Sequence, residues 1–262
     1  MNTTLTDRVV LVTGGSEGIG AGIAKSCAAC GAKVAVLARD ENELRQVVES
    51  IKRDGGEAIW VTADVTNESE MKSSVETVVE HFGKLDSLVA NAGTNGTWTP
   101  IDEMTTDEWR STIDINLTGT YMAIHFAVPH LRAAGGGSIV IMSSINGTRT
   151  FSNEGASAYA SSKAGQYALG KMLALELAPS KIRVNVICPG AIESAIHEKT
   201  DRDNLDKIET PIEYPEGKIP LTGGEYGTPD QVADLTVFLL SDSSRHITGT
   251  PVWIDGGQSL IV

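Results

Sequence analysis

The feature that most constrains the fold is an alternation, repeated along the whole chain, of short apolar runs with longer amphipathic stretches. Short runs rich in β-branched residues are typical of buried strands, and amphipathic stretches of a dozen residues or more predict helices. The strands are predicted at 8–12, 33–38, 58–62, 87–90, 138–143, 183–187 and 250–254, with helical stretches between them such as 41–54, 68–82 and 106–131. This repeated strand–helix–strand order predicts an α/β fold, a doubly wound parallel sheet of about seven strands with helices on both faces.

The length of 262 residues suits one large α/β domain, and we expect a single domain over residues 1–262. Hydrophobic residues make up 41% of the chain and charged residues 21%, a balance typical of a folded globular protein. The net charge of −13 disfavours nucleic acid and anionic membranes as partners, because both are negatively charged. The polar start "MNTTLTDR" is followed by no apolar run long enough for a signal segment, so we expect a cytoplasmic protein.

Three cysteines are too few for a disulfide framework. Cys27 and Cys30 form a C-x-x-C pair, but Cys27 continues the apolar stripe of a predicted helix that Gly31 ends. A buried structural role is therefore favoured over redox or metal chemistry. The five histidines add no metal-like cluster, and we expect no metal site.

One segment, residues 192–227, interrupts the alternation after the sixth predicted strand and is rich in acidic residues, proline and glycine. Ligands of open parallel sheets bind beyond the carboxyl ends of the strands, where this segment begins. It is therefore a candidate substrate lid, and a solvated surface loop is the alternative.

A glycine-rich sequence, "TGGSEGIG", follows the first predicted strand and opens the first predicted helix. Glycines in such a turn let the backbone approach a pyrophosphate, and the N-terminus of the next helix offers unpaired N–H groups to it. Because the motif lies at the first strand–helix junction of the pattern, it predicts a dinucleotide site.

The end of the second predicted strand, "VLARD", bears on the choice between NAD and NADP. An acidic residue there would hold the ribose hydroxyls of NAD, whereas an arginine can pair with the 2′-phosphate of NADP. Ala38 is not acidic and Arg39 follows it, so the pattern favours NADP. Glu17 and Asp40 count against this choice if they lie close to that phosphate, and NAD stays the alternative.

Tyr159 and Lys163 lie four residues apart in "AYASSKAG", among small side chains. In a helix this spacing puts the phenol and the ammonium on one face. A neighbouring ammonium stabilises a phenolate, so we expect Lys163 to lower the pKa of Tyr159 and to prepare it for proton transfer. The small neighbours leave room for a cofactor to lie against the helix.

The order of these motifs along the chain resembles that of the short-chain dehydrogenase/reductase family, in its single-domain branch. The resemblance covers essentially the whole chain. The motifs that carry it are the glycine loop, Asp64, Asn91-Ala92-Gly93, Asn116-Leu117-Thr118-Gly119, Ser143-Ser144, the Tyr159 and Lys163 pair, and Pro189-Gly190. It implies a Rossmann-type fold and an NAD(P)-dependent oxidoreductase that interconverts a carbonyl and a secondary alcohol.

The resemblance also implies roles for single residues. Tyr159 would be the general acid in reduction and the general base in oxidation, and Lys163 would lower its pKa and hold the nicotinamide ribose. Ser144, preferred to Ser143, would hydrogen-bond the substrate oxygen. Asn116 would anchor a water that relays protons from Lys163.

The same resemblance implies a cofactor-binding wall and a homotetramer. Besides Tyr159 and Lys163, that wall would consist of Gly14, Ser16, Gly18, Ile19, Gly20, Asp64, Val65, Asn91, Ala92, Gly93, Pro189, Gly190, Ile192 and Ser194. Glu17 of the loop, which departs from the family pattern, and Arg39 at the end of the second strand are expected to line the cofactor site as well. The apolar end 260–262 suits a subunit contact. Trp98, in an inserted stretch at 94–99, would line the substrate pocket or cap the sheet edge.

Four readings of the function are considered. The sequence favours a small ketone, sugar or polyol as substrate. A 3-ketoacyl carrier-protein reductase is the alternative, but an acidic carrier protein needs a basic docking surface and this chain is acidic, as is the lid. A non-catalytic dinucleotide sensor would need no Tyr159 and Lys163 pair, and nor would a methyltransferase. Arg149 could bind a carboxylate group of the substrate. We favour the alternative, in which it forms ion pairs with acidic residues on the surface.

Overall fold

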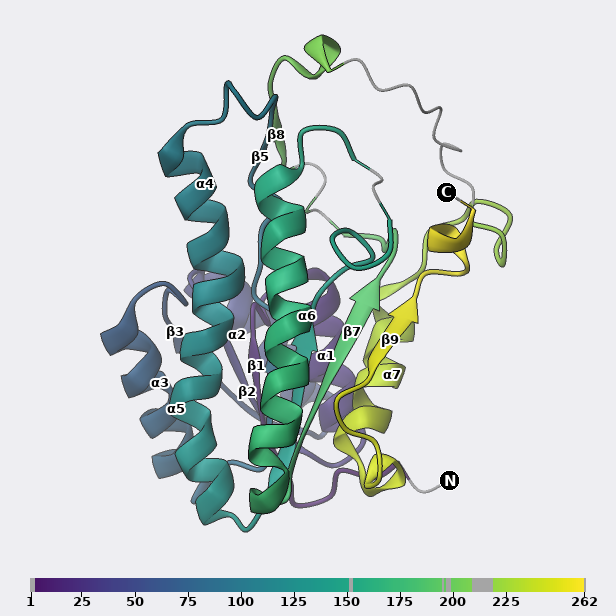
Figure 1. Ribbon diagram of the computed structural model, residues 1–262. Helices are drawn as coiled ribbons and strands as arrows, with labels where there is room; N and C mark the ends of the chain where they lie inside the picture. Colours follow the sequence, from purple (N-terminus) through teal and green to yellow (C-terminus); the bar gives the residue numbers. More distant parts are fainter. Residues whose placement is uncertain (1–2, 151–152, 195, 197–198, 209–218, 262) are drawn as a thin grey trace.

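A parallel sheet of seven strands forms the centre of the protein, in a computed structural model that describes residues 3–150, 153–194, 196, 199–208 and 219–261 (Figure 1). Their order across the sheet is β3-β2-β1-β4-β6-β7-β9, and every pair of neighbours is parallel. The strands are β1 (Val9–Thr13), β2 (Lys33–Ala38), β3 (Glu57–Thr62), β4 (Ser87–Ala90), β6 (Gly137–Met142), β7 (Ile182–Pro189) and β9 (Pro251–Ile254). The doubly wound fold predicted from the sequence is confirmed.

Helices cover both faces of the sheet because successive strand residues point to opposite sides. On one face, Val10 and Val12 of β1 pack with α1 (Gly18–Ala29), α2 (Glu41–Arg53) and α7 (Pro229–Leu240). On the other, Val9 and Leu11 pack with α3 (Glu68–Phe82), α5 (Gly119–Ala133) and α6 (Ser157–Leu177). Figure 1 shows α4 (Thr106–Ile113), α5 and α6 together on the second face. Short 3₁₀ helices lie at Ala178–Ser180, Leu205–Lys207, Asp242–Ser244 and Gln258–Leu260.

The long helical stretch predicted at 106–131 differs from the prediction in one respect. A π-helical segment, Asp114–Thr118, lies between α4 and α5, so that the three form a continuous rod. Such wider turns insert one residue into an α-helix and are frequent at functional sites. Here the wide turn carries Asn116, one of the predicted site residues.

Two segments beyond the carboxyl ends of the main sheet form a second, very small sheet that the sequence did not predict. It consists of β5 (Thr97–Trp98) and β8 (Asp201–Arg202), which pair in parallel. Of the predicted lid 192–227, residues 195, 197–198 and 209–218 lie outside the described residues, including Glu198, Glu209, Glu213, Glu216 and Lys218. The base of this segment is closed by hydrogen bonds in which Glu193 N donates to Gly227 O and Gly227 N donates to Ala191 O.

The cysteine pair behaves as the sequence indicated. Cys27 is fully buried on α1, and burial raises the pKa of its thiol far above the ordinary range. Cys30 follows α1, and the left-handed Gly31 ends the turn. Among the described residues, no three His, Cys, Asp or Glu side chains gather where they could hold a metal ion. In the same part of the chain, none of the helices combines the length and the hydropathy needed to cross a membrane.

Candidate active site

A cleft of about 900 Å³ opens at the carboxyl ends of the strands. The strand order reverses between β1 and β4, and open α/β sheets bind ligands at this point. Residues of the loops after β1, β2, β3, β4, β6 and β7 line the cleft together with residues of α6. Of all the site residues predicted from the sequence, only Asn116 does not line it.

The glycine loop forms the floor of one end of the cleft. Gly14 and Gly18 have left-handed φ angles of 63° and 52°, which other residues adopt only with strain. A side chain at Gly20 would put its Cβ 2.0 Å from Gly14 O, so only glycine fits there. The Asn91 amide braces the loop by donating to Thr13 O and Gly14 O, both at 3.1 Å.

The N-terminus of α1 points its first N–H groups into this end. No side chain caps the helix, because Glu17 at the N-cap makes no such hydrogen bond. The first helical hydrogen bond runs from Ala21 N to Glu17 O, which leaves the N–H groups of the first turn without helical partners. An uncapped helix start with a glycine loop is a binding site for an anion such as a phosphate.

Around the end of β2, the charges differ from what the sequence suggested. Arg39 is exposed and lines the cleft. Asp40 caps α2, since its carboxylate accepts a hydrogen bond of 3.0 Å from Glu43 N. The pKa of nearby Asp64 is lowered, because hydrogen bonds from Thr66 and the charge of Arg39 outweigh the effect of burial.

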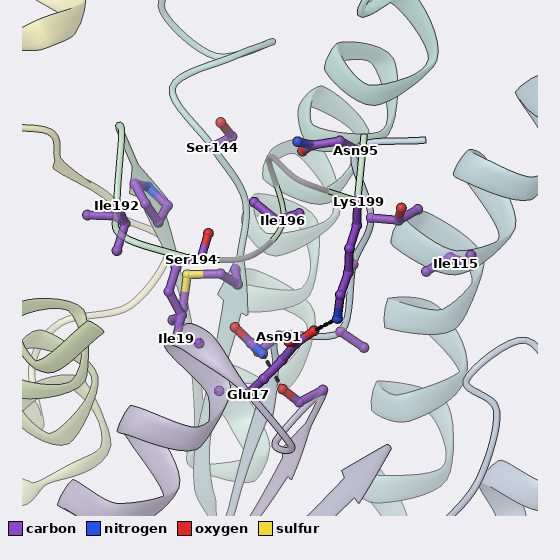
Figure 2. A pocket seen from close by; sticks show the side chains of 18 of the residues that line it. Glu17, Ile19, Asn91, Asn95, Ile115, Ser144, Ile192, Ser194, Ile196 and Lys199 are labelled. Carbon is purple, nitrogen blue, oxygen red and sulfur yellow. Dashed lines mark hydrogen bonds and ion pairs between the residues drawn. The ribbon is translucent and has the colours of Figure 1, made fainter. Parts of the chain in front are cut away.

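Glu17 forms an ion pair with Lys199 of the lid segment, across the mouth of the cleft (Figure 2). Its carboxylate is thus neutralised by a cation that comes from 182 residues further along the chain. From the sequence, Glu17 was treated as a free anion and Lys199 as one of several charges of the lid. The structure shows that the two form one ion pair across the mouth of the cleft.

Tyr159 and Lys163 lie one turn apart on α6, as their spacing predicted, and both line the cleft. Lys163 is only 5% exposed, and its Nζ donates to Met142 O at 3.0 Å. Burial lowers the pKa of this ammonium to about 8. Nζ also lies 5.6 Å from the centroid of the Tyr159 ring.

The expected lowering of the Tyr159 pKa is not found. Burial raises the pKa of this phenol, and a hydrogen bond with the Ser144 side chain offsets the rise only in part. The physical reason is that Lys163 is itself desolvated and directed to Met142 O, so its charge does not outweigh the cost of burying a phenolate.

The two serines after β6 have different partners. The Ser143 hydroxyl donates to Lys163 O at 2.8 Å and so braces α6 against the strand. Ser144 interacts with Tyr159 and lines the cleft. Ser143 also lines the cleft, and the role of Ser144 next to the substrate oxygen stays a prediction.

Asn116 lies behind the wall of the cleft and is fully buried. Its side chain bonds both backbone groups of Thr94, with Oδ1 accepting from N at 2.8 Å and Nδ2 donating to O at 2.9 Å. Nδ2 also donates to Ser162 Oγ, and Asn116 O accepts from Thr120 Oγ1 and Gln166 Nε2. These contacts make Asn116 a brace between the π-helical turn, the loop after β4 and α6, and its role as a water anchor stays a prediction.

Several cleft residues were missed by sequence reasoning. They include Asn146, Ile196 and Gln258; Asn95 was not singled out within the stretch 94–99, and Lys199 was named only as a lid charge. Gln258 Oε1 accepts from Ala191 N at 2.8 Å and fixes the turn after Gly190. Trp98 lines the cleft and is buried, so of its two predicted positions the pocket wall is the observed one.

Arg149 is exposed and does not line the cleft. Its guanidinium lies 4.1 Å from the centroid of the Trp253 ring. The charge of Arg149 contributes to the low pKa of Asp255, although hydrogen bonds from Ser259 and Gly257 contribute more. The predicted surface role, rather than the reading of a substrate carboxylate, therefore agrees with its position.

Comparison with known proteins decides the family. A family model described as enoyl-(acyl carrier protein) reductase matches residues 14–259. This chain belongs to the short-chain dehydrogenase/reductase family. The trans-4-hydroxycyclohexanecarboxylate dehydrogenase of Sinomonas cyclohexanicum is 37% identical to this member over 261 residues, which cover 97% of this chain and 93% of the relative. The levodione reductase of Leifsonia aquatica is 34% identical over 98% of this chain and 96% of its own.

Solved structures place this family member among oxidoreductases of the same fold. A structure described as a 3-ketoacyl-ACP reductase from Sinorhizobium meliloti 1021 superposes with a TM-score of 0.92 at 47% identity, covering 97% of this chain and all of the other. A levodione reductase structure superposes with a TM-score of 0.87 at 31% identity, covering 98% and 99% of the two chains. The chain is accordingly an oxidoreductase of a family that acts on alcohols and ketones.

Proposed function

We propose that this protein reduces a small ketone, and oxidises the corresponding secondary alcohol, by hydride transfer with a nicotinamide dinucleotide. The observation that supports this most is that one cleft holds both an open phosphate site at α1 and the side chains of Tyr159, Lys163 and Ser144. A dinucleotide fits here because the glycine loop presents backbone rather than side chains, and the start of α1 offers unpaired N–H groups.

The chain's own residues would supply positioning and proton transfer. Tyr159 Oη would donate a proton to the substrate carbonyl oxygen in reduction and accept it back in oxidation. Ser144 Oγ, beside Tyr159, would hydrogen-bond the same oxygen and hold it in place. The nicotinamide ring supplies or accepts the hydride when the cofactor is bound.

Lys163 would hold the ribose next to the nicotinamide and keep a positive charge near Tyr159. With a pKa near 8 it is largely protonated at neutral pH, so the charge is present. Lys163 Nζ, which donates to Met142 O in this structure, would turn towards the cleft to hold a ribose hydroxyl. The pKa of Tyr159 would then fall in the complex, since a closer ammonium stabilises the phenolate.

NADP is the cofactor that we propose. Among the described residues Arg39 forms no ion pair, so it can pair with a 2′-phosphate, and the two acids that argued against NADP both have partners, Asp40 as a helix cap and Glu17 with Lys199. The closing wall would comprise Pro189, Gly190, Ile192 and Ser194, all of which line the cleft. NAD is the alternative, and parallel titrations with NADPH and NADH distinguish the two.

The loss of NADPH absorbance in the presence of a carbonyl panel tests the activity. The panel holds cyclic ketones, hydroxyketones, diketones, ketoses and a β-ketoacyl thioester. We expect turnover of a small ketone, which Tyr159→Phe lowers by about 100-fold or more. Tyr167→Phe is the matched control, because it removes a phenol from the same helix outside the cleft and should leave the rate unchanged. Cofactor binding with unchanged rates in Tyr159→Phe would refute the mechanism.

The second candidate is a 3-ketoacyl carrier-protein reductase, which the 47% identity to the Sinorhizobium meliloti structure favours. The net charge of −13 opposes it, because an acidic carrier protein would be repelled. If the β-ketoacyl thioester is the best substrate of the panel, this second function replaces the first.

We also propose that the protein acts as a homotetramer. Tyr121 of α5 and Met172 and Leu175 of α6 expose large apolar side chains, 51%, 71% and 81% accessible, on the two helices that lie side by side on one face. Exposed large apolar side chains on one face of a protein are a feature of interaction sites. Light scattering should give four times the chain mass, and Leu175→Glu should reduce it, whereas a monomeric wild type would refute the assembly.

A further inference from the structure

We propose that Asn95 is a specificity-determining residue that accepts a hydrogen bond from a second, uncharged polar group of the substrate, a hydroxyl remote from the reacting carbon. The inference rests on the proposed function, because it concerns the substrate end of the same cleft. It names the substrate class more narrowly, as a hydroxyketone and the matching diol.

Asn95 stands at the end of the cleft where the chemistry would take place. Figure 2 shows Asn95 and Ser144 at one end of the cleft and Glu17 at the other end. The lid residues Ser194 and Ile196 lie between these two ends. The Asn95 side chain belongs to a residue that is only 4% exposed, yet it lines the cleft. Trp98 Nε1 donates to Asn95 O at 3.2 Å and so fixes the turn that carries it.

The orientation of the Asn95 amide follows from its partner. Nδ2 donates to Thr200 Oγ1 at 2.8 Å, and Thr200 Oγ1 donates to Ile196 O at 2.8 Å. A hydroxyl has one proton, which Thr200 gives to Ile196 O, so Oγ1 can only accept from Asn95. The amide nitrogen therefore faces Thr200, and the opposite orientation would bring two acceptors together.

This orientation of the amide leaves Asn95 Oδ1 without a hydrogen-bond partner among the described residues. The side chain is almost fully buried. Oδ1 is not among the buried side-chain atoms that lack a partner, so it is accessible from the cleft, where a substrate donor can take the place of solvent. A hydroxyl can donate to Oδ1 and accept from the second Nδ2 proton, whereas a ketone oxygen can only accept and a C–H can do neither.

The charges along the cleft indicate that this second group is neutral. The ionisable residues belong mainly to the cofactor end: Glu17, Arg39, Asp40, Glu43, Asp64 and Lys199. Around Asn95 the described lining is apolar or neutral, with Thr94, Trp98 and Ile196, and the cation of Lys163 already has Met142 O as its partner. Among the described residues that line this end, a substrate carboxylate would find no free cation; Arg202, whose guanidinium lies 5.3 Å from the centroid of the Trp98 ring, is not part of the lining.

A matched set of cyclohexanones tests the proposal: the hydroxycyclohexanone isomers, cyclohexanone and the cyclohexanedione isomers. For the wild type we expect kcat/KM of the best hydroxy isomer to exceed that of cyclohexanone about tenfold or more. In Asn95→Leu, which keeps the side-chain size but removes the amide, this preference should fall to about twofold or less, with cyclohexanone turnover retained. Thr200→Val, which removes the group that orients the amide, should lower the preference as well.

A binding measurement gives a second readout that does not depend on turnover. Calorimetry of the protein with oxidised cofactor should show tighter binding of a cyclohexanediol isomer than of cyclohexanol, and Asn95→Leu should remove the difference. A wild type that treats the hydroxy and plain compounds alike, or an Asn95→Leu variant that keeps the preference, would overturn the proposal. The proposed function would stand in that case, provided that Tyr159→Phe still abolishes cyclohexanone reduction.

Discussion

Replacing Lys163 by methionine should stabilise the protein near neutral pH while it abolishes activity. Lys163 is 5% exposed, and burial lowers the pKa of its ammonium from 10.5 to about 8. The folded state therefore holds this proton less tightly than the unfolded chain does. Methionine has a similar length and no charge to desolvate, so the variant avoids the cost of burying an ammonium.

The size of the effect follows from the pKa values. A fall from 10.5 to about 8, at 1.36 kcal/mol for each pKa unit, corresponds to about 3 kcal/mol of destabilisation that the wild type carries below pH 8. Losing the hydrogen bond from Nζ to Met142 O offsets this by about 1 kcal/mol. The expected net gain for Lys163→Met is about 2 kcal/mol at pH 7.

The sign of the pH dependence distinguishes this cause from better packing. Because the unfolded chain binds more protons than the folded protein between pH 8 and 10.5, the stability of the wild type from this group rises with pH through that window. The advantage of the variant should shrink by about 3 kcal/mol from pH 8 to pH 10.5. Urea unfolding of both proteins without cofactor, followed by circular dichroism, measures the difference. A stability difference that does not change with pH would refute the reasoning.

Three further predictions concern the cofactor end of the cleft. Arg39→Gln should raise KM for NADPH about tenfold and leave KM for NADH within about twofold, as initial rates with the two cofactors will show. Glu17→Gln should free Lys199 and strengthen NADPH binding at low salt, and fluorescence titrations should show the gain disappearing as the salt concentration rises. Gly20→Ala should abolish cofactor binding and lower the melting temperature, because its Cβ would lie 2.0 Å from Gly14 O, and unchanged binding would contradict the close contact.

The sheet was well predicted because its signal is local. Each buried parallel strand is a short apolar run, and the bounds of β2 and β4 are those expected from the sequence. The π-helical turn at Asp114–Thr118 was not predicted, since the insertion of one residue barely disturbs the apolar periodicity of a long amphipathic stretch. The contacts that hold this turn come from Thr94 and Gln166, which are remote in sequence.

The cofactor side of the site was also predictable, for a topological reason. In a parallel sheet the carboxyl ends of all strands meet at one edge, so the loops after β1, β2, β4, β6 and β7 must come together there. Ionisation was harder to predict. The pKa of Tyr159 depends on how deeply the ring and Lys163 are buried and on the direction of Lys163 Nζ. The four-residue spacing of the two residues in a helix reveals neither the burial nor that direction.

The substrate end depends on contacts that no local pattern encodes. Residues 94–98 and 199–202 are about a hundred residues apart, and they meet through the β5–β8 pair, the bond from Asn95 to Thr200 and that from Asp203 N to Trp98 O. Both segments extend beyond the carboxyl ends of the main sheet, so their sequences can change without disturbing its core. Relatives named for a cyclohexanecarboxylate, glucose and levodione are 33–37% identical to this chain over almost all of its length. Such similarity shows a shared fold and family, and it does not identify the substrate. If Asn95 selects the substrate as we propose, substitutions where Asn95, Trp98 and Thr200 meet should change specificity before they change stability.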